Sequence, residues 1–149
     1  MLEVTNDYTI DKAEFFDILK SNQSENRVLK YNSIRELSKN IFSAKDGDIN
    51  LTYNDITNIF DCNADINIVT LKVDEIKEGL KFIVDTKEID KQKSLCFHFH
   101  LNSDFMMIDV SEAMELIYDS ANEEANIALC ISSDESRSVN EIRINCFYF

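Results

Sequence analysis

The last part of the chain reads ANIALCISSDESRSVNEIRINCFYF over residues 125–149. Two runs in it, Ala125 to Ser132 and Glu141 to Phe149, are rich in the β-branched and aromatic residues that are typical of strands. The polar stretch Ser133 to Ser138 between them is typical of a turn. We expect the two runs to pair as an antiparallel hairpin, and such a pair excludes an all-parallel sheet.

Strand and helix patterns alternate in the preceding segment. Residues from Ile66 to Val73 and from Leu95 to Leu101 have strand character, and each run is followed by a helical pattern that begins near Asp74 or Asp109. The helices carry apolar stripes at helical spacing, which are Ile76, Leu80 and Ile83 in the first and Val110, Ala113, Met114 and Ile117 in the second. The order β-α-β-α-β-β predicts an α/β fold of the α+β sandwich type, with a mixed four-stranded sheet and helices packed on one face.

Two helices are predicted before this sheet. The first contains Phe15, Phe16 and Leu19, and the second begins near Asn32 or Ser33. The second helix carries an apolar stripe, which consists of Ile34, Leu37 and Ile41. We therefore divide the chain into an N-terminal helical segment, residues 1–30, and a domain that covers residues 31–149.

The composition indicates a compact acidic domain. The chain has 149 residues, of which 44% are hydrophobic, and a formal net charge of -13. Such a charge repels phosphate backbones and anionic lipids, so we expect neither nucleic-acid nor membrane binding. No stretch has the ~18 apolar residues of a membrane span, and the N-terminus lacks the pattern of a secretory signal. Four widely spaced cysteines favour reduced thiols, so we expect a cytoplasmic protein.

Glycine is scarce, and this excludes the common phosphate-binding loops. The chain has two glycines, Gly47 and Gly79, and no proline. Nucleotide-binding loops need clustered glycines, because the backbone N–H groups must approach the phosphate closely. We therefore expect no nucleotide, no other cofactor and no enzymatic activity.

A polar loop precedes a short helix in the middle of the chain. The stretch from Gly47 to Ile56 reads GDINLTYNDI, and its Thr52 and Asp55 have the spacing of a helix start. One interpretation is a loop that presents Asn50, Thr52 and Asp55 to a protein partner. The other is that Thr52 caps the helix and Asp55 stabilises its first turn, and both can hold at once.

The order of elements and several motifs resemble the C-terminal domain of the FtsZ/tubulin family. The stretch from Ile49 to Ile56 resembles the family's synergy loop, which reaches into the GTP site of a neighbouring subunit. Residues 125–136 and 140–144 resemble the family's Ala-Asn-Ile…Asp-Glu-Ser turn and its closing strand. Thr52 stands where the family has its first acidic residue, whereas Asn50 and the second acid, Asp55, are present. The resemblance extends from about Asn32 to Phe149.

The resemblance implies a module that acts through protein contacts. The segment before about Lys30 is too short for the family's GTPase domain, so we expect this domain to be absent. Phe15, Phe16 and Leu19 are then expected to fold back over the surface that the GTPase domain would cover. The expected partner is a subunit of a tubulin-like polymer of the cell-division type, or the chain itself as a homo-oligomer.

Two other kinds of site remain open at this stage. Cys96, His98 and His100 fall on one face of a strand, where two imidazoles and a carboxylate could hold a metal ion. An ordinary half-exposed strand face is the alternative, and no fourth ligand at a recognisable spacing is present. The rival function is a small-molecule or metal-binding α/β domain that assembles into rings.

Overall fold

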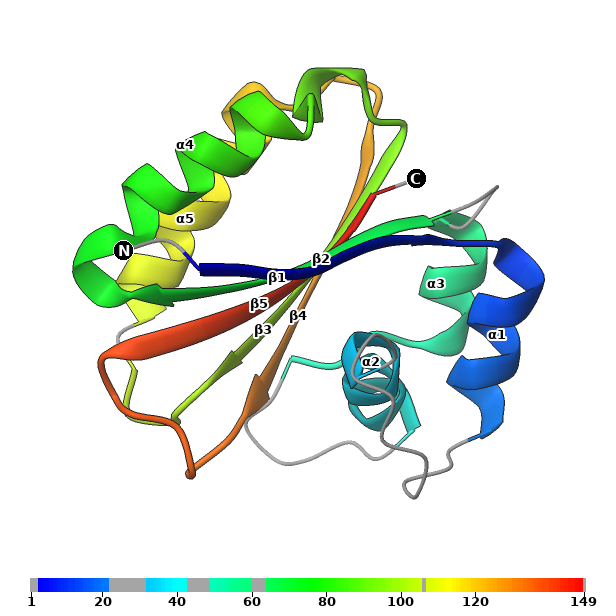
Figure 1. Cartoon of the computed structure of the whole chain (residues 1–149), viewed down its shortest axis with the longest axis horizontal. Coiled ribbons are helices and arrows are strands. Elements are labelled where there is room, and N and C mark those ends of the chain that lie inside the picture. The colour runs from blue at the N-terminus through cyan, green and yellow to red at the C-terminus, as the bar shows by residue number, and fades with distance from the viewer. Residues whose placement is uncertain (1–2, 22–31, 43–48, 60–63, 106, 149) are drawn as a thin grey trace.

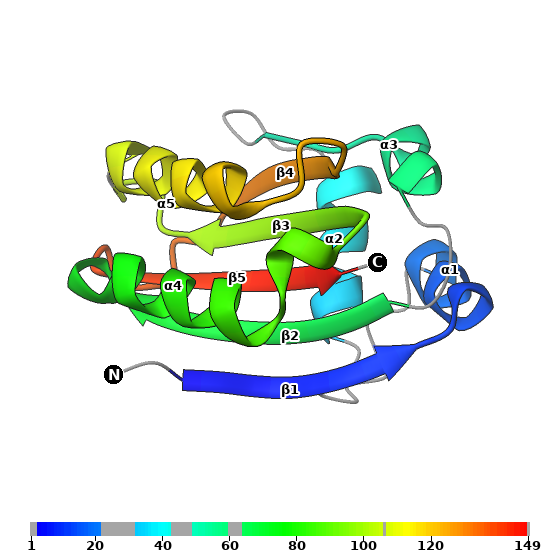
Figure 2. The same cartoon turned by 90° about the horizontal axis from the view of Figure 1, so that it is seen from above.

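The computed structural model describes residues 3–21, 32–42, 49–59, 64–105 and 107–148. Within these residues five strands form one mixed sheet in the order β1-β2-β5-β3-β4. β3 and β4 are parallel, whereas β5 is antiparallel to both β2 and β3. β1 and β4 lie at the two edges, as Figure 2 shows. The strands are β1 (Glu3–Ile10), β2 (Ala64–Lys72), β3 (Ser94–Leu101), β4 (Asn126–Ser133) and β5 (Glu141–Tyr148).

Helices cover both faces of the sheet (Figure 1). Among the described residues, α4 (Ile76–Thr86) and α5 (Met107–Ser120) pack on one face, together with the short 3-10 helices η2 (Val73–Glu75) and η3 (Ile89–Lys91). The other face is covered by α1 (Lys12–Ser21), α2 (Asn32–Phe42) and α3 (Tyr53–Ile59). The mixed α/β class expected from the sequence is confirmed. The expected packing of helices on one face alone is wrong, because α1, α2 and α3 bury their apolar residues on the second face.

The first core lies between the sheet and the pair α4 and α5. It includes the expected stripes of both helices, and Leu80, Ile83 and Ile117 are fully or almost fully buried in it. A Cβ atom on Gly79 would lie 2.4 Å from Leu71 Cδ2, so this glycine lets α4 approach β2 closely. A larger residue at this position would therefore displace the buried Leu71 side chain.

The sheet contains one strand more than the four expected. β1 pairs with β2 in an antiparallel ladder, so the N-terminal segment contains a strand as well as helix α1. The pairing register shifts between Thr5 and Tyr8, where Asn6 and Asp7 interrupt the strand-forming residues. This polar interruption hides the strand from a search for alternating apolar residues.

The predicted hairpin of the last two strands is wrong. β3 lies between β4 and β5 and pairs with both. The loop of residues 134–140 passes the end of β3, where the Asp134 amide donates to the Leu101 carbonyl at 2.7 Å. β4 and β5 are separated by one strand, so their ends lie about 10 Å apart. A hairpin loop has two to about five residues, and this longer loop can cross that distance.

Candidate functional site

The segment that resembles a synergy loop leads into α3, and its polar residues form the start of that helix. Thr52 Oγ1 accepts a hydrogen bond from the Asp55 amide at 3.1 Å, and Asp55 Oδ2 accepts one from the Thr52 amide at 2.9 Å. This reciprocal pair is a capping box, which satisfies two amides that the helix leaves unbonded. Both residues are exposed. The capping interpretation is therefore confirmed, and the same two side chains remain available to a partner.

Ile49 to Leu51 are held against the edge strand β4. Ile49 and Ile131 exchange two backbone hydrogen bonds, at 3.1 and 2.9 Å. Asn40, on α2, accepts from the Leu51 amide at 3.0 Å and donates to the Ile49 carbonyl at 3.2 Å. Asn40 is buried, its bond from Leu51 is buried and its bond to Ile49 is part-buried. Together these bonds fix the position of the α3 start relative to the sheet.

Asn50 differs in exposure from the two capping residues. It is half-buried, and its side-chain oxygen is buried without a hydrogen-bond partner among the described residues. An unsatisfied buried acceptor of this kind destabilises a protein by about 1–3 kcal/mol. Of the three residues predicted to meet a partner, the structure thus places Thr52 and Asp55 at the surface and turns the Asn50 oxygen inward.

Apolar side chains surround the exposed helix start. Phe42 is 48% and Ile49 is 47% exposed, and the Phe42 and Tyr53 rings lie 6.0 Å apart. The Phe16 ring also lies near Tyr53, with 6.0 Å between the ring centroids. Lys20 Nζ lies 5.6 Å from the Tyr53 ring centre, a cation–π distance. The loop therefore combines exposed polar groups with exposed apolar area.

The residues of the predicted N-terminal cover lie in a second core, between the sheet and helices α1 to α3. Phe15 and Leu19 are fully buried in the same cluster as Ile34 and Leu37 of α2, and Phe16 is half-buried at its margin. The Phe15 ring lies 6.0 Å from that of Phe147, edge to face. That α1 covers a surface in place of the GTPase domain stays a prediction.

A buried polar chain continues from Asn40 into the sheet. Asn40 Nδ2 donates to Ser132 Oγ at 2.9 Å, and His98 Nε2 lies 2.8 Å from the same oxygen. Asn145 Nδ2 lies 3.3 Å from His98 Nδ1. Burial lowers the pKa of His98 to about 3, so its ring is neutral. Nδ1 faces the Asn145 amide nitrogen, which can only donate, and this arrangement favours a proton on Nε2 that is donated to Ser132 Oγ.

The expected half-exposed face of β3 is therefore wrong for Cys96 and His98, which are both fully buried. The cause is the set of helices α1 to α3, which covers this face of the sheet. One sequence feature indicates the polar chain, because Asn40 continues the buried stripe of Ile34 and Leu37 at helical spacing. A polar residue at a buried position needs a partner, but a single sequence does not reveal which one.

His100 belongs to a half-buried network of charges at one end of β3. Its Nε2 lies 3.5 Å from Glu36 Oε2 on α2, and its Nδ1 accepts from Arg137 Nε at 3.1 Å. Glu36 also pairs with Arg143 of β5. Burial raises the pKa of Glu36. The network ties α2 to the sheet near the residues that hold the loop.

The described part of the chain contains no group of three His, Cys, Asp or Glu side chains that could hold a metal ion. Within the same residues, no helix is both long and apolar enough to cross a bilayer.

Comparison with known proteins supports the fold. No protein-family model matches the chain, and no curated protein matches it significantly. Among solved structures, the chain is similar to that of an empty FtsZ dimer from M. jannaschii, with a TM-score of 0.61 and 19% sequence identity. The match covers 84% of this chain but 40% of the FtsZ chain. The chain thus has an FtsZ-like fold over most of its length and spans less than half of that FtsZ chain.

Proposed function

We propose that this chain is a protein-interaction module of the FtsZ/tubulin C-terminal type, which contacts a tubulin-like polymer subunit or a second copy of itself. The observation that carries the proposal is the α3 start, where Thr52 and Asp55 are exposed in a fixed position at the edge of an FtsZ-like fold. The contact is made by these residues and by the apolar side chains beside them.

The rigidity of this surface favours binding. Asn40 and the Ile49–Ile131 backbone pair hold the segment before α3, so little conformational entropy is lost when a partner docks. Phe42 and Ile49 provide exposed apolar area, and buried aromatic anchors contribute much of the affinity of protein interfaces. The polar groups of Thr52 and Asp55 then determine which partner surface is complementary to this site.

We further propose that these residues act by contact and not by catalysis. The Asp55 carboxylate already accepts a hydrogen bond in the capping box. Thr52 stands where the family has its other acidic residue. Water activation generally requires a base with matched geometry and pKa. A single exposed, helix-capping carboxylate supports a binding role better.

A pair of matched variants tests the proposal. Phe42→Ser removes a ring that is 48% exposed beside the α3 start, and Phe82→Ser removes one that is 49% exposed on α4, on the opposite face. Self-association is measured by sedimentation velocity. Binding to a tubulin-like GTPase of the same organism is measured by co-pelleting with its polymers.

We expect the unchanged chain to associate in at least one of these assays. Phe42→Ser should weaken that association about tenfold or more, as loss of an interface anchor does, and Phe82→Ser should change it less than twofold. Equal effects of the two variants, or no association in either assay, would contradict the proposal. Circular dichroism of both variants checks that the fold is kept.

A further inference from the structure

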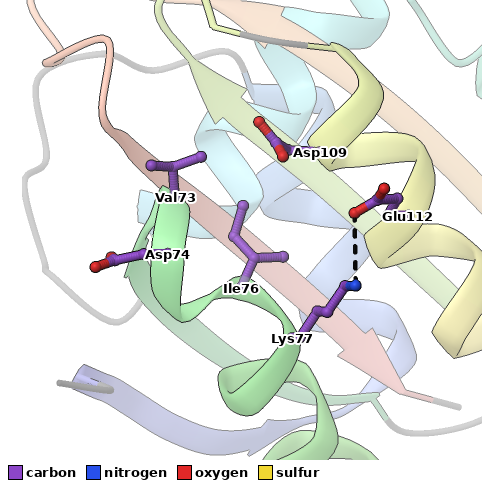
Figure 3. A pocket seen from close by; sticks show the side chains of 6 residues that line it. All are labelled: Val73, Asp74, Ile76, Lys77, Asp109 and Glu112. Carbon is purple, nitrogen blue, oxygen red and sulfur yellow. Dashed lines mark ion pairs between the residues drawn. The ribbon is translucent and has the colours of Figure 1, made fainter.

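A hollow of about 210 Å³ lies between the starts of α4 and α5, on the face of the sheet opposite to the α3 loop. Figure 3 shows η2 and the first turn of α4 on one side and α5 on the other. Small-molecule sites usually measure about 300–1,000 Å³. The hollow is therefore too small for a nucleotide-sized ligand and suits one or two protruding side chains. Its lining consists of Val73, Asp74, Ile76, Lys77, Asp109 and Glu112.

The charge of the hollow is negative. Asp109 and Glu112 lie on α5, and Asp74 lies at the outer rim with its carboxylate directed away from α5 (Figure 3). The cation in the lining is Lys77, which pairs with Glu112 at 3.8 Å. Both side chains of that pair are largely exposed, at 76% and 48%, and such surface pairs contribute only about 0–1 kcal/mol. An incoming cation can therefore replace Lys77.

Exposed apolar residues directly precede two of these acidic residues in the chain. Val73 is 37% exposed, and Ile108, which precedes Asp109, is 62% exposed. The Val73 amide donates to the Asn140 carbonyl at 2.9 Å, so the β4–β5 loop with Val139, itself 46% exposed, lies at the same end of the sheet. Helix-dipole stabilisation explains acidic residues in a first helical turn. It does not explain why the residue before Asp74, Val73, and the residue before Asp109, Ile108, are exposed apolar residues.

We propose that this hollow receives a basic side chain, carried next to an apolar residue, from a partner protein. The aliphatic part of a lysine or arginine packs on Val73 and Ile76, and its charged end meets Asp109 and Glu112. The neighbouring apolar residue covers Ile108. A second copy of this chain is a poor occupant, because its net charge of -13 repels an acidic surface. The site lies on the face opposite to the α3 start, so it is independent of the function proposed above.

The probe is a fluorescein-labelled peptide, Gly-Ser-Lys-Leu-Lys-Leu-Ser-Gly, and the control peptide has glutamate in place of lysine. Amide chemical shifts of the ¹⁵N-labelled chain locate the binding, and fluorescence anisotropy measures the affinity. We expect shifts at residues 73–77 and 108–112, and we expect none with the control peptide.

Two double variants separate the site from general charge attraction. Asp74→Asn with Asp109→Asn removes two carboxylates at the hollow, and Asp85→Asn with Asp119→Asn removes two exposed ones from the far ends of the same helices. The first pair should weaken binding about three- to tenfold, and the second less than twofold. Ile108→Ser should weaken it several-fold. Equal losses from both double variants, shifts spread over the whole acidic surface, or no binding at millimolar peptide would overturn the proposal.

Discussion

At the scale of single residues, Thr52 and Asp55 cap helix α3, and we propose that the same side chains also contact a partner. Each side chain accepts a hydrogen bond from the other residue's amide, and both lie at the surface. The local geometry is therefore set before any partner arrives. A side chain that is already ordered loses less entropy on binding than a free one.

Replacing Thr52 with alanine should lower the free energy of unfolding by about 0.5–2 kcal/mol, because the helix loses its N-cap. Thr52→Ser keeps the hydroxyl and should change it much less. Thr57→Ala is a control in the same helix, since Thr57 is exposed and its hydroxyl donates only to the Asn54 carbonyl. Urea denaturation measures all three. A midpoint that is unchanged by Thr52→Ala would show that Thr52 is not the cap.

His98 should remain neutral well below the pH at which an ordinary histidine is protonated. Burial lowers its pKa to about 3, whereas an unfolded chain has a value of about 6.5. Between these two values the unfolded state binds the extra proton. His98 therefore contributes a loss of stability as the pH falls from about 6.5, with a slope of at most about 1.4 kcal/mol per pH unit.

Long-range ¹H–¹⁵N spectra of the imidazoles test this directly. We expect His98 to show the neutral ring with the proton on Nε2 from pH 8 down to about pH 4.5. An imidazolium signal for His98 at pH 6 would contradict the buried hydrogen-bond chain through Ser132 and Asn145.

At the scale of elements, helices and central strands could be predicted from the sequence, whereas strand pairing could not. The stripes of α4 and α5 are local patterns, and the structure buries them as expected. β3 is a strand as expected, but both of its faces are buried, because helices cover both sides of the sheet. The position of β5 between β2 and β3 depends on contacts that are distant in sequence. β1 was missed because Asn6 and Asp7 break its pattern.

In the candidate site too, the local interactions could be predicted from the sequence and the long-range ones could not. The Thr52–Asp55 spacing indicated the capping box, which is a local interaction. The roles of Asn40, Ser132 and His98 come from three elements that meet only in the folded chain. A sequence shows that a polar residue occupies a buried position, but the fold decides its partner.

Gly79→Ala should destabilise the protein, although alanine favours helices by about 1 kcal/mol over glycine. The new Cβ would lie 2.4 Å from Leu71 Cδ2, and Leu71 is itself buried. Overpacking of this kind typically lowers stability by about 1–3 kcal/mol. In a Leu71→Ala background, the same substitution should stabilise instead. A thermodynamic cycle from urea denaturation would contradict the close packing of α4 on β2 if the effect of Gly79→Ala were the same in both backgrounds.

At the scale of the whole molecule, one sheet separates two surfaces with different chemistry. The α1–α3 face carries the fixed loop with Phe42 and Ile49 exposed beside it. The α4–α5 face carries the acidic hollow. The high net negative charge disfavours close approach of two copies at the acidic surfaces, so any contact between copies is expected at the more apolar loop.

Hydrogen exchange of the chain, alone and with polymers of a tubulin-like GTPase, tests the central claim most directly. Amides in α3 (Tyr53–Ile59) and in the preceding stretch from Ile49 should be protected when the polymer is added, because the α3 start is the proposed contact. Amides of α4 should exchange at an unchanged rate. Protection confined to α4 and α5, with none at residues 49–59, would contradict the account.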